Sequence, residues 1–373
     1  MCDMKRREFL QAVSVGTCGL LGASVVPSVA LGADERYLKE ARFYEALPEK
    51  KVRCLVCPRQ CVVGDGQRGY CRVRENIDGK YYSLVFGRVC AYHIDPIEKK
   101  PLFHFLPGTT AFSVAAVGCN LACKFCQNWE ISQAKPEDVE ATDLPPAKLA
   151  DAATRYGSPT MAYTYTEPIV YCEYVMASAR EGHERGIRSV MISAGYMNGE
   201  TMRELAGAMD AIKIDLKAHS DDFYKNICSA SLAPVLKTIS GIKKSGTWLE
   251  IVNLIIPTLN DDDEQIESLS KWLLDNVGDE VPVHFTRFHP TYKLKNLPQT
   301  QVSSVERARE IAMAQGLKYA YVGNVPAGHP GEHTYCPGCG KAVVKRTGYA
   351  VLSIDLENGK CSACGTVIPG VWS

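Results

Sequence analysis

The sequence predicts an α/β protein: a partial or complete (β/α) barrel over residues 111–333, with a cysteine-rich metal module before it and a zinc-ribbon tail after it. Short apolar runs alternate with amphipathic helical segments, as in parallel strands joined by helical crossovers, and six or more such units favour a barrel. The predicted strands are 111–117, 160–165, 189–193, 211–216, 249–256, 283–288 and 317–322, and the helical stretches include 146–156, 169–185, 202–209 and 263–276.

Composition and charge narrow the function classes. The 373 residues are 46% hydrophobic and 23% charged, which is typical of a globular protein with a sizeable core. Lys+Arg and Asp+Glu are both 42, so the formal net charge is zero and neither nucleic acid nor an anionic membrane is indicated as the main partner. Eleven of the 16 cysteines fall into three tight clusters, which favours metal sites over a disulfide framework.

The first 33 residues resemble a twin-arginine signal peptide. Paired arginines at 6–7 precede Phe9-Leu10, a mildly apolar stretch over 12–29 and small residues at 30–33. We therefore expect export to the periplasm or cell exterior, with no stable membrane span after cleavage. An uncleaved anchor or a chance basic start are the alternatives, and without a functional leader the protein would be cytoplasmic.

Residues 34–110 carry the first cysteine cluster. Four thiolates within eighteen residues can close a tetrahedral zinc site or ligate an auxiliary [4Fe–4S] cluster. Zinc is slightly favoured because no electron route is visible in the sequence, and disulfides stay open for an exported protein. A hairpin-like stretch is predicted over 80–94, with turns at Gly79 and Gly87. The candidate ligands are Cys54, Cys57, Cys61 and Cys71.

The central triplet, Cys119, Cys123 and Cys126, has the spacing C-x3-C-x2-C directly after the first barrel strand. Three thiolates satisfy three irons of a [4Fe–4S] cluster and leave the fourth iron free to chelate S-adenosylmethionine (SAM). Phe125 is expected to shield the cluster and lean on the adenine. The alternatives are a zinc site with a distant fourth ligand, for which no second pair lies nearby, and three incidental core thiols.

These motifs resemble the radical SAM superfamily. The stretch 164–168 looks like its Gly-Gly-Glu-Pro element, which implies that Glu167 accepts a hydrogen bond from the SAM ammonium; a helix N-cap is the alternative. Asp215 and Lys217 resemble the Asp-Leu-Lys of glycyl-radical activating enzymes, in which both face the SAM, although a plain ion pair is possible. Further pocket candidates, for which a buried polar role is nearly as plausible, are Ser193, Asn253 and His289.

Residues 334–373 contain paired knuckles with the spacing C-x2-C-x21-C-x2-C. A glycine after each pair permits the turn in which backbone amides donate to sulfur, so we expect a zinc ribbon or rubredoxin-like site. The neutral charge favours a structural staple over a nucleic-acid contact, and an electron-relaying iron is the lesser alternative. The ligands are Cys336, Cys339, Cys361 and Cys364, whereas Cys90, Cys172 and Cys228 read as ordinary buried thiols.

A closer resemblance is to the radical SAM member of the AmmeMemoRadiSam system, which is similar to pyruvate formate-lyase activating enzymes. It runs from about residue 50 to the end, and implies a one-electron donor and possible Memo-like or AMMECR-like protein partners. The stretches that carry it are Cys-x-x-Cys-Pro at 54–58, Gly69-Tyr70-Cys71, 96–107 with His104 and Phe105, 126–128, 166–168 and 323–325.

Three functions follow from this reading of the sequence. The first is an enzyme that cleaves SAM reductively to a 5′-deoxyadenosyl radical and abstracts hydrogen from an unidentified small or partner-presented substrate. The second is an activase that places a glycyl radical on a partner enzyme. The third is a non-enzymatic iron–sulfur and zinc protein for electron transfer or redox sensing, in which Glu167, Asp215 and Lys217 would not converge.

Overall fold

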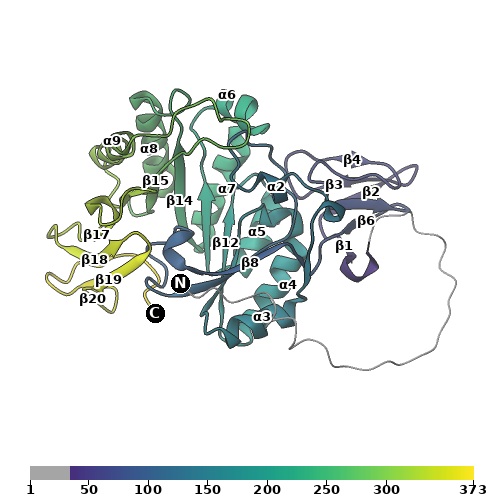
Figure 1. The fold of residues 1–373 in the computed structure, drawn as a ribbon, viewed down its shortest axis with the longest axis horizontal. Helices are drawn as coiled ribbons and strands as arrows, with labels where there is room; N and C mark the ends of the chain where they lie inside the picture. Colours follow the sequence, from purple (N-terminus) through teal and green to yellow (C-terminus); the bar gives the residue numbers. More distant parts are fainter. Residues whose placement is uncertain (1–33) are drawn as a thin grey trace. The chain divides into compact units, whose positions relative to one another are not determined.

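The computed structural model of the protein describes residues 34–373 (Figure 1). The predicted signal peptide, residues 1–33, lies outside the described residues. Among the residues described, we find no helix that is both long and apolar enough to cross a membrane.

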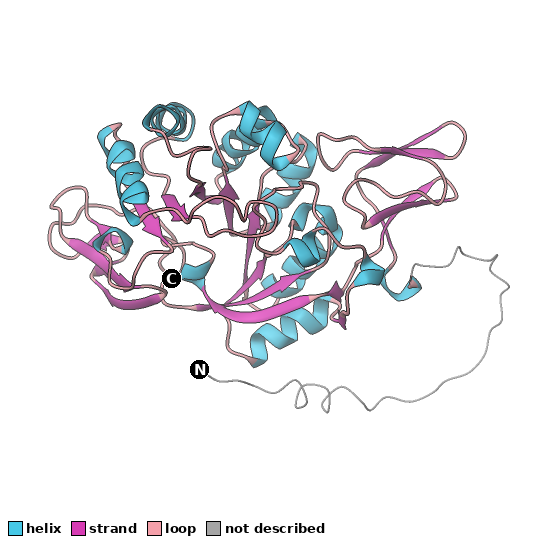
Figure 2. Cartoon of the chain, turned by 45° about the horizontal axis from the view of Figure 1, so that its top comes forward, coloured by secondary structure: helices cyan, strands magenta, loops and turns pink. Residues whose placement is uncertain are grey.

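The central element is a sheet accompanied by helices, drawn in magenta and cyan in Figure 2. The sheet has eight strands, is mostly parallel and has the order β16-β15-β14-β13-β12-β11-β9-β8. Only the β8–β9 pair is antiparallel. The strands are nearly continuous apolar runs because helices cover their outer face and the barrel interior covers the other. Their bounds are β8 Ala91–Pro96, β9 Thr110–Ala115, β11 Thr160–Tyr163, β12 Arg188–Ser193, β13 Ala211–Asp215, β14 Trp248–Ile255, β15 Val283–Arg287 and β16 Ala320–Gly323.

The crossover helices begin and end at recognisable signals. The Asp262 carboxylate accepts a hydrogen bond from the backbone N–H of Gln265 at the start of α8, and α7 ends at Gly246 in the left-handed conformation. The helices are α2 Trp129–Ser132, α3 Pro146–Arg155, α4 Cys172–His183, α5 Gly199–Ala208, α6 Asp221–Phe223, α7 Leu232–Ser245, α8 Asp263–Val277 and α9 Val302–Ala314, followed by the short helical turns η1 Glu35–Tyr37, η2 Ile97–Lys99, η3 Pro136–Asp138, η4 Pro168–Tyr171, η5 Tyr224–Cys228 and η6 Pro330–Glu332.

The barrel is partial, since β8 and β16 are the edges of the sheet and do not pair with each other. Residues 102–106 fill its amino-terminal end. There Glu250 of β14 accepts hydrogen bonds from the backbone N–H groups of Phe103 and His104, at 3.0 and 2.8 Å, and from the His284 ring at 2.7 Å. These hydrogen bonds fix the segment across this end of the barrel.

The N-terminal module consists of two small antiparallel sheets, β1-β6-β5 and β2-β3-β4, with β7 pairing with β10. The predicted hairpin over 80–94 does not form. Gly79 instead closes the β5–β6 hairpin, and β8 leaves the module to become the edge strand of the central sheet. The bounds are β1 Lys39–Glu40, β2 Tyr44–Leu47, β3 Lys51–Cys54, β4 Val62–Val63, β5 Arg74–Ile77, β6 Lys80–Ser83, β7 Arg88–Val89 and β10 Thr142–Asp143.

The C-terminal tail is a three-stranded antiparallel sheet with a small hairpin after it, seen in yellow in Figure 1. Phe103 and Tyr321 of the barrel pack with Cys336 and Val343 of the tail in one apolar cluster. The tail is thus built onto the barrel. Its strands are β17 Thr334–Tyr335, β18 Ala342–Thr347, β19 Ala350–Ile354, β20 Leu356–Glu357 and β21 Lys360–Cys361.

Candidate active site

A cavity of about 480 Å³ opens at the carboxyl ends of the parallel strands. This is the end at which barrel enzymes carry their active sites. Residues from β13, β14 and β15 and from the loops after β9, β11 and β12 line it. The sequence-predicted residues that reach its wall are Cys119, Cys123, Phe125, Cys126, Glu167, Asp215 and Lys217.

The loop that follows β9 brings the three central thiols to the cavity. The backbone N–H of Leu121 donates to Cys119 Sγ at 3.3 Å, and Ser132 Oγ lies 3.3 Å from Cys126 Sγ. Burial raises the pKa of Cys119 and of Cys126, so their thiolates require positive charge beside them. Irons bound inside the cavity would supply that charge.

A fourth thiol, Cys228, touches the triplet from outside the cavity. A hydrogen bond from it lowers the pKa of Cys123, and the backbone N–H of Ala122 donates to the Cys228 carbonyl at 3.0 Å. Cys228 is buried and does not line the cavity. The cavity therefore offers three thiols, a donor set that fits a [4Fe–4S] cluster with one open iron.

Glu167, the carboxylate expected to accept a hydrogen bond from the SAM ammonium, lines the cavity. It is 2% exposed, and burial raises its pKa. Ser193 Oγ donates to Oε1 at 2.7 Å, while the backbone N–H of Ala194 donates to Oε2 at 2.8 Å. The N-cap bond, from the N–H of Ile169, is longer at 3.5 Å. Glu167 is both a helix cap and a cavity residue, so the two interpretations coexist.

Asp215 and Lys217 form an ion pair, which was the alternative interpretation of these residues, and both also line the cavity. Lys217 Nζ lies 3.6 Å from Asp215 Oδ2, and Lys213 Nζ lies 2.5 Å from Oδ1. Burial opposes ionisation of Asp215, but the two lysines hold its pKa below the ordinary value. Lys217 also lies 5.6 Å from the centre of the Phe125 ring. Two lysine side chains thus face one carboxylate in this part of the cavity wall.

Three predicted pocket residues do not line the cavity. Val252 and Leu254 point into it, so Asn253 between them faces outward, where its amide donates to the Leu216 carbonyl at 2.7 Å. His289 is exposed, because β15 ends at Arg287 before it. Ser193 also lies off the cavity wall and acts on it through Glu167.

The sequence reading missed part of the cavity wall. Lys99 and Lys100 line it, and both contact Asp95, at 2.9 and 2.6 Å. The Tyr165 hydroxyl also donates to Asp95. Tyr349, from the turn between β18 and β19, reaches the same cavity from the tail.

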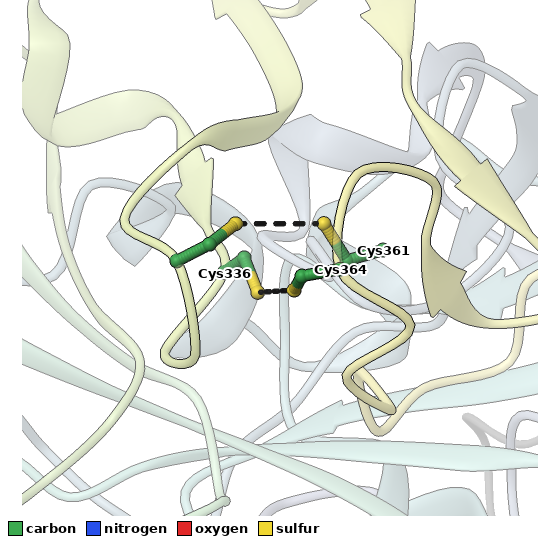
Figure 3. A group of neighbouring side chains, drawn as sticks. Cys336, Cys361 and Cys364 are labelled. Carbon is green, nitrogen blue, oxygen red and sulfur yellow. Dashed lines mark hydrogen bonds between the residues drawn. The ribbon is translucent and has the colours of Figure 1, made fainter.

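The two outer cysteine sets differ in geometry. Cys336 and Cys364 have their sulfurs 3.5 Å apart, and those of Cys339 and Cys361 are 3.8 Å apart (Figure 3). All four sulfurs lie within 4.8 Å of one another. Among residues 34–373 no other group of three or more Cys, His, Asp or Glu is as close. The tail therefore has the geometry of a mononuclear metal site.

The N-terminal set forms a second, smaller cavity. Its four cysteines are free thiols, and all of them line this space of about 20 Å³. The disulfide alternative therefore has no support within the described residues.

Comparison with known proteins identifies the superfamily. The family model "Radical SAM superfamily" matches residues 114–273. The uncharacterized protein MJ0808 of Methanocaldococcus jannaschii is 45% identical over 333 residues, covering 89% of this chain and 99% of the relative. The pyruvate formate-lyase-activating enzyme of Clostridium pasteurianum is 24% identical over 175 residues, or 46% of this chain and 72% of that enzyme.

Among solved structures, a radical SAM methyltransferase from Sphaerobacter thermophilus is 19% identical with a TM-score of 0.47, covering 58% of this chain and 67% of that one. The family match spans the triplet, Glu167, Asp215 and Lys217, the same residues that meet at the cavity. The domain implies an iron–sulfur cluster and SAM, and the chain belongs to the radical SAM superfamily.

Proposed function

We propose that the protein is an enzyme that binds a [4Fe–4S] cluster through Cys119, Cys123 and Cys126, cleaves SAM reductively, and abstracts a hydrogen atom from a small substrate. The observation that carries this proposal is the convergence of the three thiols with Glu167 and the Asp215–Lys217 pair on one cavity. A non-enzymatic electron carrier does not need these side chains to line the same cavity as the thiols.

The residues divide the recognition of SAM between them. Glu167, held at both oxygens by Ser193 and Ala194, faces the cavity as the acceptor for the SAM ammonium. Lys217 and the Phe125 ring stand side by side at the triplet, where adenine and carboxylate groups need an aromatic face and a cation. Cys119, Cys123 and Cys126 would hold the cluster, and the chemistry it would supply is the one electron needed for reductive cleavage of SAM to methionine and a 5′-deoxyadenosyl radical.

The size of the cavity favours a small substrate over a protein loop. At about 480 Å³ it falls within the range of about 300–1,000 Å³ that is usual for small-molecule sites. SAM itself must occupy part of this volume, and Tyr349 and Asn324 also line it. A glycyl-radical activase would need an open groove for a peptide, so we rank that function second.

The remaining assignments extend this proposal. The similarity to pyruvate formate-lyase-activating enzyme supports a requirement for a low-potential one-electron donor. Membership of the AmmeMemoRadiSam system, with Memo-like or AMMECR-like partners, and export by the twin-arginine route remain proposals that rest on sequence resemblance.

The test is SAM cleavage by the anaerobically reconstituted protein. With SAM and dithionite, the wild type should release 5′-deoxyadenosine, and Cys123→Ala should not. Cys90→Ala is the matched control, because its thiol contacts the Ala115 carbonyl outside the cavity and its loss should leave release unchanged. Absence of release from protein with a verified [4Fe–4S] signal would instead favour electron transfer.

A further inference from the structure

The four N-terminal cysteines surround an enclosed space. Cys54, Cys57 and Cys71 are buried and Cys61 is partly buried, and all four line the cavity of about 20 Å³. The module, the loop after β9 and the helical segment after β11 build the wall together, through Tyr81, Asn120 and Val170. Four soft thiol ligands with no carboxylate in the lining select zinc or an iron–sulfur cluster.

The spacing of the sulfurs separates these two groups. One zinc ion binds four sulfurs at about 2.3 Å, which places the sulfurs about 3.8 Å apart and leaves no room for a water-sized sphere between them. The tail cysteines match this, with sulfur pairs at 3.5 and 3.8 Å. Among the described residues the N-terminal sulfurs do not form a group as close as the four tail sulfurs, which all lie within 4.8 Å of one another, and they line the enclosed space instead.

The central triplet provides a second reference within the same chain. Its sulfurs likewise do not form a group as close as that of the tail, as expected where each thiolate binds a different iron of a cube. In this respect the N-terminal set is like the central triplet and unlike the tail.

A buried donor without a partner points into the same space. The Tyr81 hydroxyl is fully buried, lines the cavity and has no hydrogen-bond partner among the described residues. An orphaned buried hydroxyl costs about 1–3 kcal/mol, so a bound acceptor is expected there. The inorganic sulfides of a cluster are such acceptors, whereas a zinc ion adds none.

The loop after β9 lines both the large cavity and the small one. Cys119 lines the large cavity and Asn120, the next residue, lines the small one. Arg59, between Cys57 and Cys61, donates to the Asn120 carbonyl at 2.6 Å. Gly118 has φ 101°, and a Cβ there would lie 2.9 Å from the Cys71 carbonyl oxygen. The backbones that carry both thiol sets are thus in direct contact.

We infer that Cys54, Cys57, Cys61 and Cys71 hold an auxiliary [4Fe–4S] cluster, adjacent to the SAM-binding cluster, and that the tail alone holds zinc. The inference goes beyond the proposed function and rests on it in one respect, the assignment of the central triplet to a [4Fe–4S] cluster. The absence of a close sulfur group, an enclosed space between the four thiols and an orphaned hydroxyl carry it together.

The test removes the SAM-binding cluster and counts what remains. The full chain, purified anaerobically and loaded with iron and sulfide, should contain about eight irons and about one zinc. A variant with Cys119, Cys123 and Cys126 all changed to Ala should keep about four irons and an electron paramagnetic resonance signal of a reduced [4Fe–4S] cluster. Because this variant cannot cleave SAM, the result is independent of the proposed activity.

Two further measurements guard against misfolding. Adding Cys57→Ser and Cys61→Ser to that variant should abolish the remaining iron and leave the zinc content unchanged. Anomalous scattering from wild-type crystals at the iron and zinc edges locates each metal without any substitution. An iron-free triple variant with about two zincs, or with about one zinc and disulfides at the N-terminal set, would overturn the inference.

Discussion

The Ser193 hydroxyl donates to Oε1 of Glu167 at 2.7 Å, and this bond aims a buried carboxylate into the cavity. Ser193 ends β12, so its position is set by the sheet. The adjoining N–H of Ala194 holds the second oxygen, a role that needs no side chain. The cavity thus contains a carboxylate whose direction is determined by the backbone of the neighbouring strand.

Weakening this support should weaken SAM binding. Ser193→Ala removes a net hydrogen bond of about 1 kcal/mol, and we expect about fivefold weaker binding. Glu167→Gln removes the charge that faces the ammonium and should cost more than tenfold, since charge-assisted bonds are about twice as strong. Equilibrium dialysis of SAM with the oxidised holoprotein measures both. His289→Ala is the control, and a loss of affinity there would contradict the cavity described above.

Cys228 should tune the central cluster without binding it. Its thiol donates toward Cys123, and hydrogen bonds to cluster sulfurs set reduction potentials. Cys228→Ala removes a donor that stabilises the more negative, reduced cluster, so the midpoint potential should fall. Potentiometric titration followed by electron paramagnetic resonance checks this. Iron content should stay at the wild-type value, and a loss of iron would make Cys228 a ligand.

Mild acid should destabilise the barrel through His104. Burial lowers its pKa to about 4, since the ring is enclosed with Nε2 accepting from Tyr321 and Nδ1 donating to the Pro369 carbonyl. In the unfolded chain the pKa is about 6.5, so the unfolded state binds the extra proton first. Stability is retained above pH ~6.5 and falls toward pH ~4, by at most about 1.4 kcal/mol per pH unit.

The measurement for His104 is urea unfolding of the holoprotein at pH 7.5, 6.5 and 5.5. His104→Gln lacks the titrating ring but keeps all metal sites, Glu250 and His284, so the difference between the two pH dependences isolates His104. Equal pH dependences in variant and wild type would exclude this role.

Loss of the tail metal should loosen the barrel as well as the tail. Cys336 is buried in the cluster that contains Phe103 and Tyr321, so Cys336→Ser disturbs a site joined to the barrel. We expect the zinc to be lost and the midpoint of thermal unfolding to fall, as for other structural metal sites. Scanning calorimetry with zinc analysis tests this, and Cys90→Ser, outside all three cysteine sets, is the control.

The sequence predicted the cavity residues that lie at or just after the ends of strands. The cysteine triplet, Glu167 and Asp215 each follow or end an apolar run, and parallel strands bring such positions to one edge. The same periodicity also indicates on which face of a strand two further residues lie. Lys213 stands two residues before Asp215 on the same face of β13, and the alternation around Asn253 places it on the outer face.

Other features depend on contacts between distant parts of the chain. Lys99 and Lys100 line the cavity from the segment after β8, whose antiparallel pairing places Pro96 opposite Thr110 of β9, and Tyr349 lines it from the tail. Local patterns do not encode such pairings. The spacing of thiols in space, which separates the N-terminal set from the tail, is likewise absent from a C-x2-C pattern.

Residues 102–106, which fill the amino-terminal end of the barrel, also contact residues near the end of the sequence, which are synthesised last. The Pro369 carbonyl accepts from His104, and the Val371 carbonyl accepts from the N–H of Leu106 at 2.7 Å. On the ribosome the barrel strands are complete long before these residues emerge, yet domains otherwise fold largely in order of synthesis. These contacts at the amino-terminal end of the barrel therefore form only after translation has passed residue 371.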